Sequence, residues 1–435
     1  MARHSTYTPL DVFINSRLVG RLRRETSGAV EFQYHTKWLD WEHSFPISLS
    51  LPLRTDRYIG APVLAVLENL LPDNDVILRR VAERVHAQGT DAYSLLTAIG
   101  RDCVGALQFL PEGVDPGPAG HIDAHPIADS EIAELLRDLT RIPLGLSRDY
   151  EFRISIAGAQ EKTALLLWNG KWYKPKGSTA TTHILKRPIG RTGGGIDLST
   201  SVENEYLCLL LAKAFGLPTA NTEIRFFDNE KALVVERFDR FWTKDGRLLR
   251  VPQEDCCQAL SVPPSQKNEA EKGPGMPAIL RLLNGSDEAL SDQQTFFRAN
   301  IVYWLLGAID GHAKNFSLSL GEGGRYRLTP MYDIVSAQFA VAAGQIRQND
   351  FKLAIAVGTN RHFVVDRIAP RHFLQTAKAA GIGELSVRAM FDDLHERATK
   401  EVEAVMNELP QNFPAQVSDP IYSGIKKRIR LFEVS

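Results

Sequence analysis

The chain has 435 residues, of which 44% are hydrophobic and 24% charged, the composition of a globular protein with more than one core. Its 51 Lys and Arg residues nearly balance its 52 Asp and Glu residues. With a net charge of -1, the protein has no overall positive field that would attract nucleic acid. No apolar run is long enough to cross a membrane and the N-terminus lacks a secretion signal, so we expect a cytoplasmic protein with no membrane partner.

Residues 1–112 are predicted to form a small α/β domain. Apolar segments at 12–14 and 18–22 flank a polar turn, and apolar and polar residues alternate at 30–34, which is typical of short antiparallel strands. Helical spacing follows at 62–71, 75–85 and 92–99, before a strand pattern returns at 104–110. The Pro- and Gly-rich stretch that begins at Pro111 predicts a boundary, and residues 113–150 then form a linker with one short helix.

Residues 151–240 predict a second sheet. A strand at 152–156 and another at 164–168 flank a loop of small residues, through which backbone amides can approach anionic oxygens, although an ordinary hairpin has the same pattern. The alternating strand 182–186 ends in Lys186, placed as kinases place the lysine that binds ATP phosphates, although exposed strand lysines are more frequent. Residues 232–239 form a buried strand that leads into a polar turn.

Residues 241–435 are predicted to be mainly helical, with helices at 277–283, 292–307 and 370–409. The exception is a hairpin over residues 317–328, which follows the polar loop Asp310-Gly311-His312-Ala313-Lys314-Asn315. The basic run 426–430 could meet DNA phosphates, but a solvated helix end is the ordinary interpretation.

The loop at 310–315 and Asp333, which follows the hairpin, carry the chemistry expected of phosphoryl transfer. A first carboxylate, Asp310, can orient the attacking hydroxyl, while Asn315 and Asp333 offer the hard oxygen ligands that Mg²⁺ prefers. His312 and Lys314 can bring donors or positive charge to the transferred phosphate. Taken alone the pattern is weak, because Asp-Gly is a common turn pair and Asp and Asn often cap helices.

Five motifs together give the chain a specific resemblance, over nearly its whole length, to the HipA family of serine/threonine kinases from bacterial type II toxin–antitoxin modules. These motifs are Asn69-Leu70-Leu71-Pro72-Asp73, Ile99-Gly100-Arg101-Asp102, the run from Ser155 to Thr163, Glu236-Arg237-Phe238-Asp239, and the run from Asp310 to Asn315. The resemblance implies an α+β, protein-kinase-like two-lobed fold. Its β-rich N-lobe would carry the extra N-terminal subdomain, with the ATP-binding part at 151–240, and its C-lobe at 241–435 would be all-helical.

The resemblance also implies ATP and Mg²⁺ as cofactors and assigns site residues. Asp310 would be the catalytic base, Asn315 and Asp333 the metal ligands, and Ser155 the site of an inactivating autophosphorylation, because a phosphate there would repel those of ATP. The implied ATP contacts are Ala157, Gly158, Ala159, Gln160, Glu161, Lys162, Lys186, Glu236, Arg237, Phe238, His312, Ala313, Lys314, Asn315, Tyr332 and Asp333.

The implied partners are a HipB-like helix-turn-helix antitoxin dimer, operator DNA bound through that complex, and a protein substrate. The substrate class in this family is an aminoacyl-tRNA synthetase, typically glutamate–tRNA ligase, whose modification halts translation. Two alternatives stay open from the residues: a small-molecule kinase, which uses the same acid, amide and acid, and a non-catalytic corepressor module. A zinc hydrolase is disfavoured, because His312 has no second histidine at ligand spacing.

Overall fold

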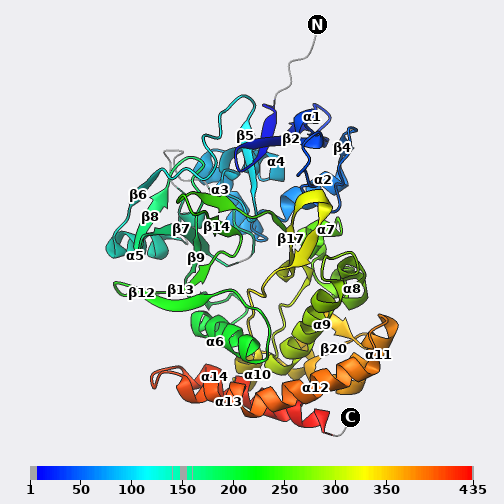
Figure 1. Ribbon diagram of the computed structural model, residues 1–435. Helices are drawn as coiled ribbons and strands as arrows, with labels where there is room; N and C mark the ends of the chain where they lie inside the picture. Colours follow the sequence, from blue (N-terminus) through cyan, green and yellow to red (C-terminus); the bar gives the residue numbers. More distant parts are fainter. Residues whose placement is uncertain (1–6, 140, 147–153, 159, 434–435) are drawn as a thin grey trace. The chain divides into compact units, whose positions relative to one another are not determined.

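The computed structural model describes residues 7–139, 141–146, 154–158 and 160–433 (Figure 1). The chain forms two compact units, each built from three segments. Unit 1 comprises Met1–Arg187, Arg225–Ser265 and Leu318–Tyr326, and unit 2 comprises Pro188–Ile224, Gln266–Ser317 and Arg327–Ser435. Within the described ranges, no helix combines the length and the apolar character that spanning a membrane requires.

Unit 1 begins with a five-stranded antiparallel sheet in the order β4-β3-β2-β1-β5. Strands β1 and β2 are joined by Asn15 and Ser16, both at positive φ, as a two-residue hairpin loop requires. The sheet and its helices enclose one core that includes Phe32, Trp38 and Phe109. The elements are β1 Leu10–Ile14, β2 Arg17–Arg24, β3 Val30–Tyr34, β4 Tyr58–Ile59, β5 Leu107–Pro111, α1 Thr36–Leu39, α2 Ala61–Glu68, α3 Asp75–Val85 and α4 Ala92–Ile99.

The second sheet has six strands in the order β12-β13-β9-β7-β8-β6. Helix α5 covers one face, where Leu136 shares a core with Leu165, Trp172 and Phe227. The elements are β6 Ala124–Pro126, α5 Asp129–Asp138, β7 Lys162–Trp168, β8 Lys171–Pro175, β9 His183–Lys186, β12 Thr222–Phe227 and β13 Glu230–Glu236.

Short strands follow this sheet in the chain. Strands β14 Arg240–Trp242 and β15 Leu248–Arg250 form a hairpin, and β16 Gln253–Asp255, β17 Ser317–Leu320 and β18 Tyr326–Leu328 form a three-stranded sheet. Helix α7 Cys256–Ala259 follows β16 and is entirely buried.

Unit 2 is mostly helical. The long helix α9 is buried along most of its length, including Phe296, Phe297 and Trp304. The elements are β10 Gly190–Arg191, β11 Asp197–Leu198, α6 Ser201–Ala214, α8 Met276–Leu283, α9 Ala289–Leu306, α10 Gln338–Ala342, β19 Lys352–Val357, β20 His362–Val364, α11 Pro370–Ala379, α12 Glu384–Thr399, α13 Glu401–Glu408 and α14 Ala415–Ile429.

The mixed fold, with a sheet-rich N-terminal part and a helical C-terminal part, is confirmed. The C-terminal part is not purely helical, because the hairpin β19–β20 accompanies its helices. The strand predicted at 152–156 is wrong for its described residues, 154–156, which are irregular because Ser155 N–H donates to the carbonyl of Asp102 (2.9 Å) rather than to a strand. The expected domain boundaries stay a prediction.

Candidate active site

The loop from Asp310 to Asn315 begins where α9 ends in unit 2. Gly307 terminates the helix with φ +65°, and a side chain there would collide with the ring of Phe351. The loop is then folded on itself: His312 N–H donates to the Asp310 carbonyl (2.9 Å) and Asn315 N–H to the His312 carbonyl (2.9 Å). Both functional ends of the loop therefore have fixed backbone positions.

The side chain of Asn315 is oriented by the same loop. Its Nδ2 donates to the backbone carbonyl of Asp310 at 2.7 Å, and the residue is buried. Because the NH₂ group is committed to that carbonyl, the amide oxygen is the end that can accept a cation. This is the orientation that the predicted metal ligand needs.

Asp310 differs from its neighbours in exposure. Its side chain is 60% exposed, whereas that of His312 is 3% exposed, and His312 Nε2 lies 3.5 Å from Asp310 Oδ1. Between them, Gly311 packs so closely on the ring of Tyr303 that a Cβ would lie 2.3 Å from its Cδ2. The glycine of this loop is therefore required by packing, and the acid beside it faces solvent.

Asp333 reaches the same region through backbone pairing. Met331 forms a parallel bridge to Thr219, and Ser336 forms an antiparallel bridge to Ala308. Asp310 lies two residues after Ala308 and Asp333 three residues before Ser336, so antiparallel pairing places the two acids at the same end of the bridge. Asp333 itself has φ +56°, a left-handed conformation that is uncommon outside glycine.

Side-chain hydrogen bonds hold the segment around Asp333 in place. Asn204 of α6 donates to the carbonyl of Ser336 (2.7 Å) and accepts from its N–H (3.0 Å), while Ser336 Oγ donates to the Leu306 carbonyl (2.6 Å). The Tyr332 hydroxyl donates to the Lys314 carbonyl (3.0 Å) and lies 2.5 Å from Ser317 Oγ. The segment that carries Asp333 is thereby tied to α9 and to the loop.

Tyr303 lies beneath the loop and stacks on Phe316, with ring centroids 5.7 Å apart. Burial raises the pKa of its hydroxyl well above the usual range, and the charge of Asp333 adds to that effect. The electrostatic influence of Asp333 on Tyr303 is a second sign that Asp333 lies close to the loop.

Arg428 of α14 supports the end of α9 from behind. Its guanidinium donates to the Leu305 carbonyl (3.1 and 2.8 Å) and to Gln338 (3.0 Å) and is buried, whereas Lys426 and Lys427 are exposed. The interpretation of residues 426–430 as a solvated helix end is therefore wrong for Arg428, which satisfies a carbonyl at the end of α9.

The predicted phosphate-binding lysines of unit 1 lie at the ends of two central strands of the second sheet. Lys162 and Lys186 are direct partners on the antiparallel strands β7 and β9, so their side chains leave the same face. Lys162 Nζ donates to the Ala157 carbonyl, and a Cβ on Gly158, which has φ +105°, would lie 2.5 Å from that ammonium. The lysine therefore holds the loop, and the loop requires its glycine.

The rest of the loop is also anchored. Gln160 donates to the Arg187 carbonyl (2.8 Å), Glu161 lies 3.6 Å from Arg80, and Gly158 accepts from Asp73 N–H (3.3 Å). Ala159 lies outside the described residues. Ser155, just before the loop, is fully buried and its hydroxyl donates to the Leu70 carbonyl (2.8 Å).

The predicted adenine contacts lie at and just after the end of β13. Glu236 is exposed and pairs with His183 across the sheet, and Phe238 is half-buried. The guanidinium of Arg237 is buried and bonded to Asp239, Thr181 and the Cys103 carbonyl, and its N–H donates to Thr182, so its backbone carbonyl is the group left to meet a ligand. These ATP contacts stay predictions.

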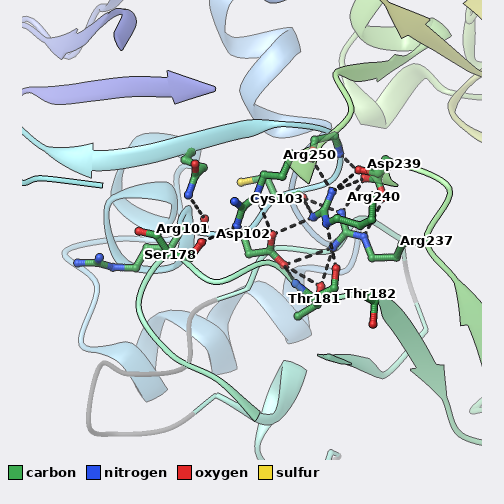
Figure 2. A network of polar contacts seen from close by, with 12 residues as sticks. Arg101, Asp102, Cys103, Ser178, Thr181, Thr182, Arg237, Asp239, Arg240 and Arg250 are labelled. Carbon is green, nitrogen blue, oxygen red and sulfur yellow. Dashed lines mark hydrogen bonds and ion pairs between the residues drawn. The ribbon is translucent and has the colours of Figure 1, made fainter. Parts of the chain in front are cut away.

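Sequence reasoning missed the buried charge cluster around Asp102, shown in Figure 2. Asp102 and Asp239 stood in recognised motifs without an assigned role, Arg237 was predicted only as an ATP contact, and Arg240 and Arg250 were not singled out. Five charged side chains, each at most 4% exposed, meet here. The one available signal was the density of opposite charges in the motifs at 101–102 and 237–240.

Comparison with known proteins agrees with this architecture. The family model of the HipA N-terminal domain matches residues 10–110, and that of the HipA-like C-terminal domain matches residues 154–402, more than half of the chain. The putative kinase Y4mE of Sinorhizobium fredii is 32% identical over 407 residues, which cover 93% of each chain.

Two further matches come from Shewanella oneidensis. Its serine/threonine-protein kinase toxin HipA is 29% identical over 368 residues, covering 81% of this chain and 79% of that protein. A solved complex of HipA, HipB and operator DNA contains a chain that superimposes with a TM-score of 0.81 at 24% identity, over 98% of both chains, which establishes the shared fold. The chain is therefore a member of the HipA family of kinases.

Proposed function

We propose that this kinase uses ATP and Mg²⁺ to phosphorylate a Ser or Thr hydroxyl of a protein, with Asp310 as the catalytic base. The observation that carries the proposal is the bond from Asn315 Nδ2 to the Asp310 carbonyl, which fixes an amide oxygen beside an exposed carboxylate. Asp310 is exposed enough to accept the proton of an incoming hydroxyl, and His312 lies close enough to influence its charge.

The residues present fit a hard divalent cation. Asn315 and Asp333 would hold it through an amide oxygen and a carboxylate, a partial set of the kind that Mg²⁺ completes with phosphate oxygens and water. When bound, the cation neutralises phosphate charge during transfer. The hydrogen bonds of Tyr332 and Asn204 keep the two protein ligands in place, so that the site is preorganised.

In unit 1, we assign phosphate binding to Lys186 and to the loop at 157–162. Lys162 and Lys186 leave one face of the sheet as direct partners, which concentrates positive charge where an anion would bind. Glu236, Phe238 and the main chain of Arg237 are the proposed adenine contacts. The bond from Lys162 to the Ala157 carbonyl would keep the loop folded while it covers the phosphates.

We also propose that the protein is the toxin of a toxin–antitoxin module in the cytoplasm. A relative carries the name of a serine/threonine-protein kinase toxin, and the neighbour in fold was solved with HipB and operator DNA. The proposed partners are a HipB-like helix-turn-helix antitoxin and, through it, operator DNA, at which this chain would act as corepressor. The proposed substrate is an aminoacyl-tRNA synthetase, with glutamate–tRNA ligase the first to test.

Ser155 is the proposed site of self-inactivation. Its hydroxyl is buried and donates to the Leu70 carbonyl, so it cannot accept a phosphate in this conformation. A phosphorylated Ser155 would place a dianion in a buried site, which is costly unless the segment moves. We therefore expect the modification to trap the loop at 157–162 in a different conformation.

The test is intact-mass analysis and peptide mapping after incubation with ATP and Mg²⁺, with EDTA as the metal control and glutamate–tRNA ligase as the added acceptor. The proposal expects Mg²⁺-dependent phosphate on the acceptor and on the peptide that contains Ser155, with the latter lost in Ser155→Ala. Unchanged phosphate on that peptide in Ser155→Ala would refute the self-inactivation site. Transfer to small molecules alone, or no binding of ATP with Mg²⁺ by calorimetry, would refute protein kinase activity.

A further inference from the structure

Asp102 is fully buried and is surrounded by cationic side chains (Figure 2). Its Oδ1 accepts from Arg240 Nη2 (2.8 Å) and from Arg250 Nε (3.1 Å) and Nη2 (3.0 Å). Its Oδ2 accepts from Thr181 N–H (3.0 Å), Thr181 Oγ1 (2.7 Å) and, at 3.5 Å, Arg237 Nη1. Burial alone would raise the pKa of Asp102, but Arg240, Arg250 and Arg237 outweigh burial and hold its pKa well below the usual range. The carboxylate is therefore charged at neutral pH.

The rest of the cluster is closed by a second acid and by backbone oxygens. Asp239 accepts from Arg237 (2.9 and 2.7 Å) and from Gly105 N–H (2.7 Å) and lies 3.1 Å from Arg240. Three guanidinium groups face two carboxylates, and the carbonyls of Cys103, Gly105, Ser178 and Thr181 accept further N–H donors. Each buried charge thus has several fixed partners, the condition under which a buried ion pair specifies one geometry.

The cluster connects the three segments to which the proposed function assigns ATP. The Asp102 carbonyl accepts from Ser155 N–H (2.9 Å), two residues before the phosphate loop. The Asp102 carboxylate binds Thr181, just before the strand that ends in Lys186. Arg237, which stands between the two proposed adenine contacts in the sequence, bonds Thr181 of the cluster. Its N–H donates to the Thr182 carbonyl (2.8 Å).

We propose that Asp102 is a positioning residue for nucleotide binding: from the N-terminal domain, it holds the phosphate loop, the Lys186 strand and the adenine-contacting turn at fixed spacing. This proposal rests on the function proposed above. Asp102 does not touch the nucleotide in this scheme. Its carboxylate acts directly through Thr181 and Arg237. Its backbone carbonyl holds the Ser155 amide, so a shift of residue 102 also moves that segment.

The direct variant is Asp102→Asn, which keeps the shape of the side chain but leaves the three arginines with Asp239 as their one acidic partner. Because that variant can fail to fold, Thr181→Val is the second: it removes one hydroxyl that bonds both Asp102 and Arg237, and Thr181→Ser restores it. Thr376→Val is the matched control, since Thr376 is a buried threonine of α11 whose hydroxyl bonds His372 and Gly358.

The readouts are affinity for ATP with Mg²⁺, the division of any kinetic effect between KM and kcat, and hydrogen exchange of the protein without nucleotide. We expect Thr181→Val to weaken ATP binding about tenfold and to raise KM more than it lowers kcat, since a hydrogen bond to a buried charge is lost. Thr181→Ser should recover most of the affinity. Thr376→Val should stay within about twofold of wild type, as expected for an independent site.

Hydrogen exchange separates this proposal from the proposed function. In Thr181→Val, amides at 154–158, 182–187 and 236–239 should all exchange faster, whether or not ATP binds. If wild type binds no ATP but the three segments loosen together, the kinase proposal fails and the connecting role of Asp102 stands without a nucleotide. Wild-type ATP affinity in Thr181→Val, or faster exchange only near residue 181, would overturn the positioning role.

Discussion

Asp102 and Asp310 stand in similar short motifs, Gly-Arg-Asp and Asp-Gly-His, yet their surroundings are opposite. In unit 1, the side chain of Asp102 is 1% exposed and meets three arginines. In unit 2, the side chain of Asp310 is 60% exposed and has one histidine 3.5 Å away. The first carboxylate is held on several sides by buried charged partners, and the second is open to solvent.

The difference shows how one residue type serves two purposes. A buried, paired carboxylate stabilises a geometry, and removing it leaves buried cations without a partner. An exposed carboxylate beside fixed ligands contributes little to folding but can act on a substrate. Substitutions at the two positions should therefore separate stability from activity.

The largest effect should come from Asp310→Asn. We expect phosphate transfer to fall on the order of 10²–10⁴-fold, because the general base is lost, while the melting temperature stays near that of wild type. Transfer is measured by intact mass and stability by thermal denaturation. Asp392→Asn, an exposed acid of α12 in the same unit, is the control and should change neither. Full transfer by a folded Asp310→Asn would remove Asp310 from the chemistry.

Asp102→Ala should have the largest effect on stability. It leaves Arg237, Arg240 and Arg250 buried with one acid, and we expect a loss of about 3–5 kcal/mol in urea denaturation. Because the pKa of Asp102 is lowered in the folded state, the stability that it contributes is present above its ordinary pKa and is lost only as pH falls below it.

The control for Asp102→Ala is Asp11→Ala, since Asp11 is a buried acid that pairs with the single, part-exposed Arg21 (2.9 Å). Its loss should be clearly smaller. Equal losses of unfolding free energy in Asp102→Ala and Asp11→Ala would show that the number of buried arginines does not determine the loss of stability.

The sequence predicted helices well where local signals were strong, and it missed contacts between distant residues. Helices α3 and α4 have the predicted bounds because Asn74 and Asp91 cap them and their apolar residues repeat at helical spacing. The loop at 310–315 and Asp333 could also be found, since their spacing and a family resemblance mark them.

The charge cluster and the support behind α9 could not be predicted from local pattern. Arg250 and Arg428 would be read as exposed, as most arginines are, because their partners lie 148 and 123 residues away in the sequence. The strand prediction failed over its described residues, 154–156, for the same reason: alternation shows that a segment can be extended, but the partner of Ser155 is an isolated carbonyl of Asp102.

A smaller effect is expected from Gly311→Ala, which tests whether the exposed acid depends on tight packing beside it. The added Cβ would lie 2.3 Å from Tyr303 Cδ2, and we expect a loss of about 1–3 kcal/mol together with reduced transfer, because the loop must shift. Gly193→Ala, where a Cβ would meet nothing within 4 Å, is the control. Unchanged transfer and stability in Gly311→Ala would show that the loop tolerates displacement.

Glu254 sharpens the comparison as a third kind of acid, buried like Asp102 but bonded to neutral donors, the Leu49 N–H (2.8 Å) and Ser48 Oγ (2.5 Å). Burial raises its pKa to about 8, although these hydrogen bonds oppose the shift. The folded state therefore binds a proton that the unfolded state releases above about pH 4.5. The free energy of unfolding should then fall as pH rises from there to about 8, by at most about 1.4 kcal/mol per pH unit.

The test is urea denaturation across this pH range. Glu254→Gln should lose the pH dependence of the unfolding free energy, and Glu408→Gln, an exposed control, should keep it. A slope that persists in Glu254→Gln would mean that neutral donors alone can keep a buried carboxylate ionised, and that arginines are not what separates Asp102 from Glu254.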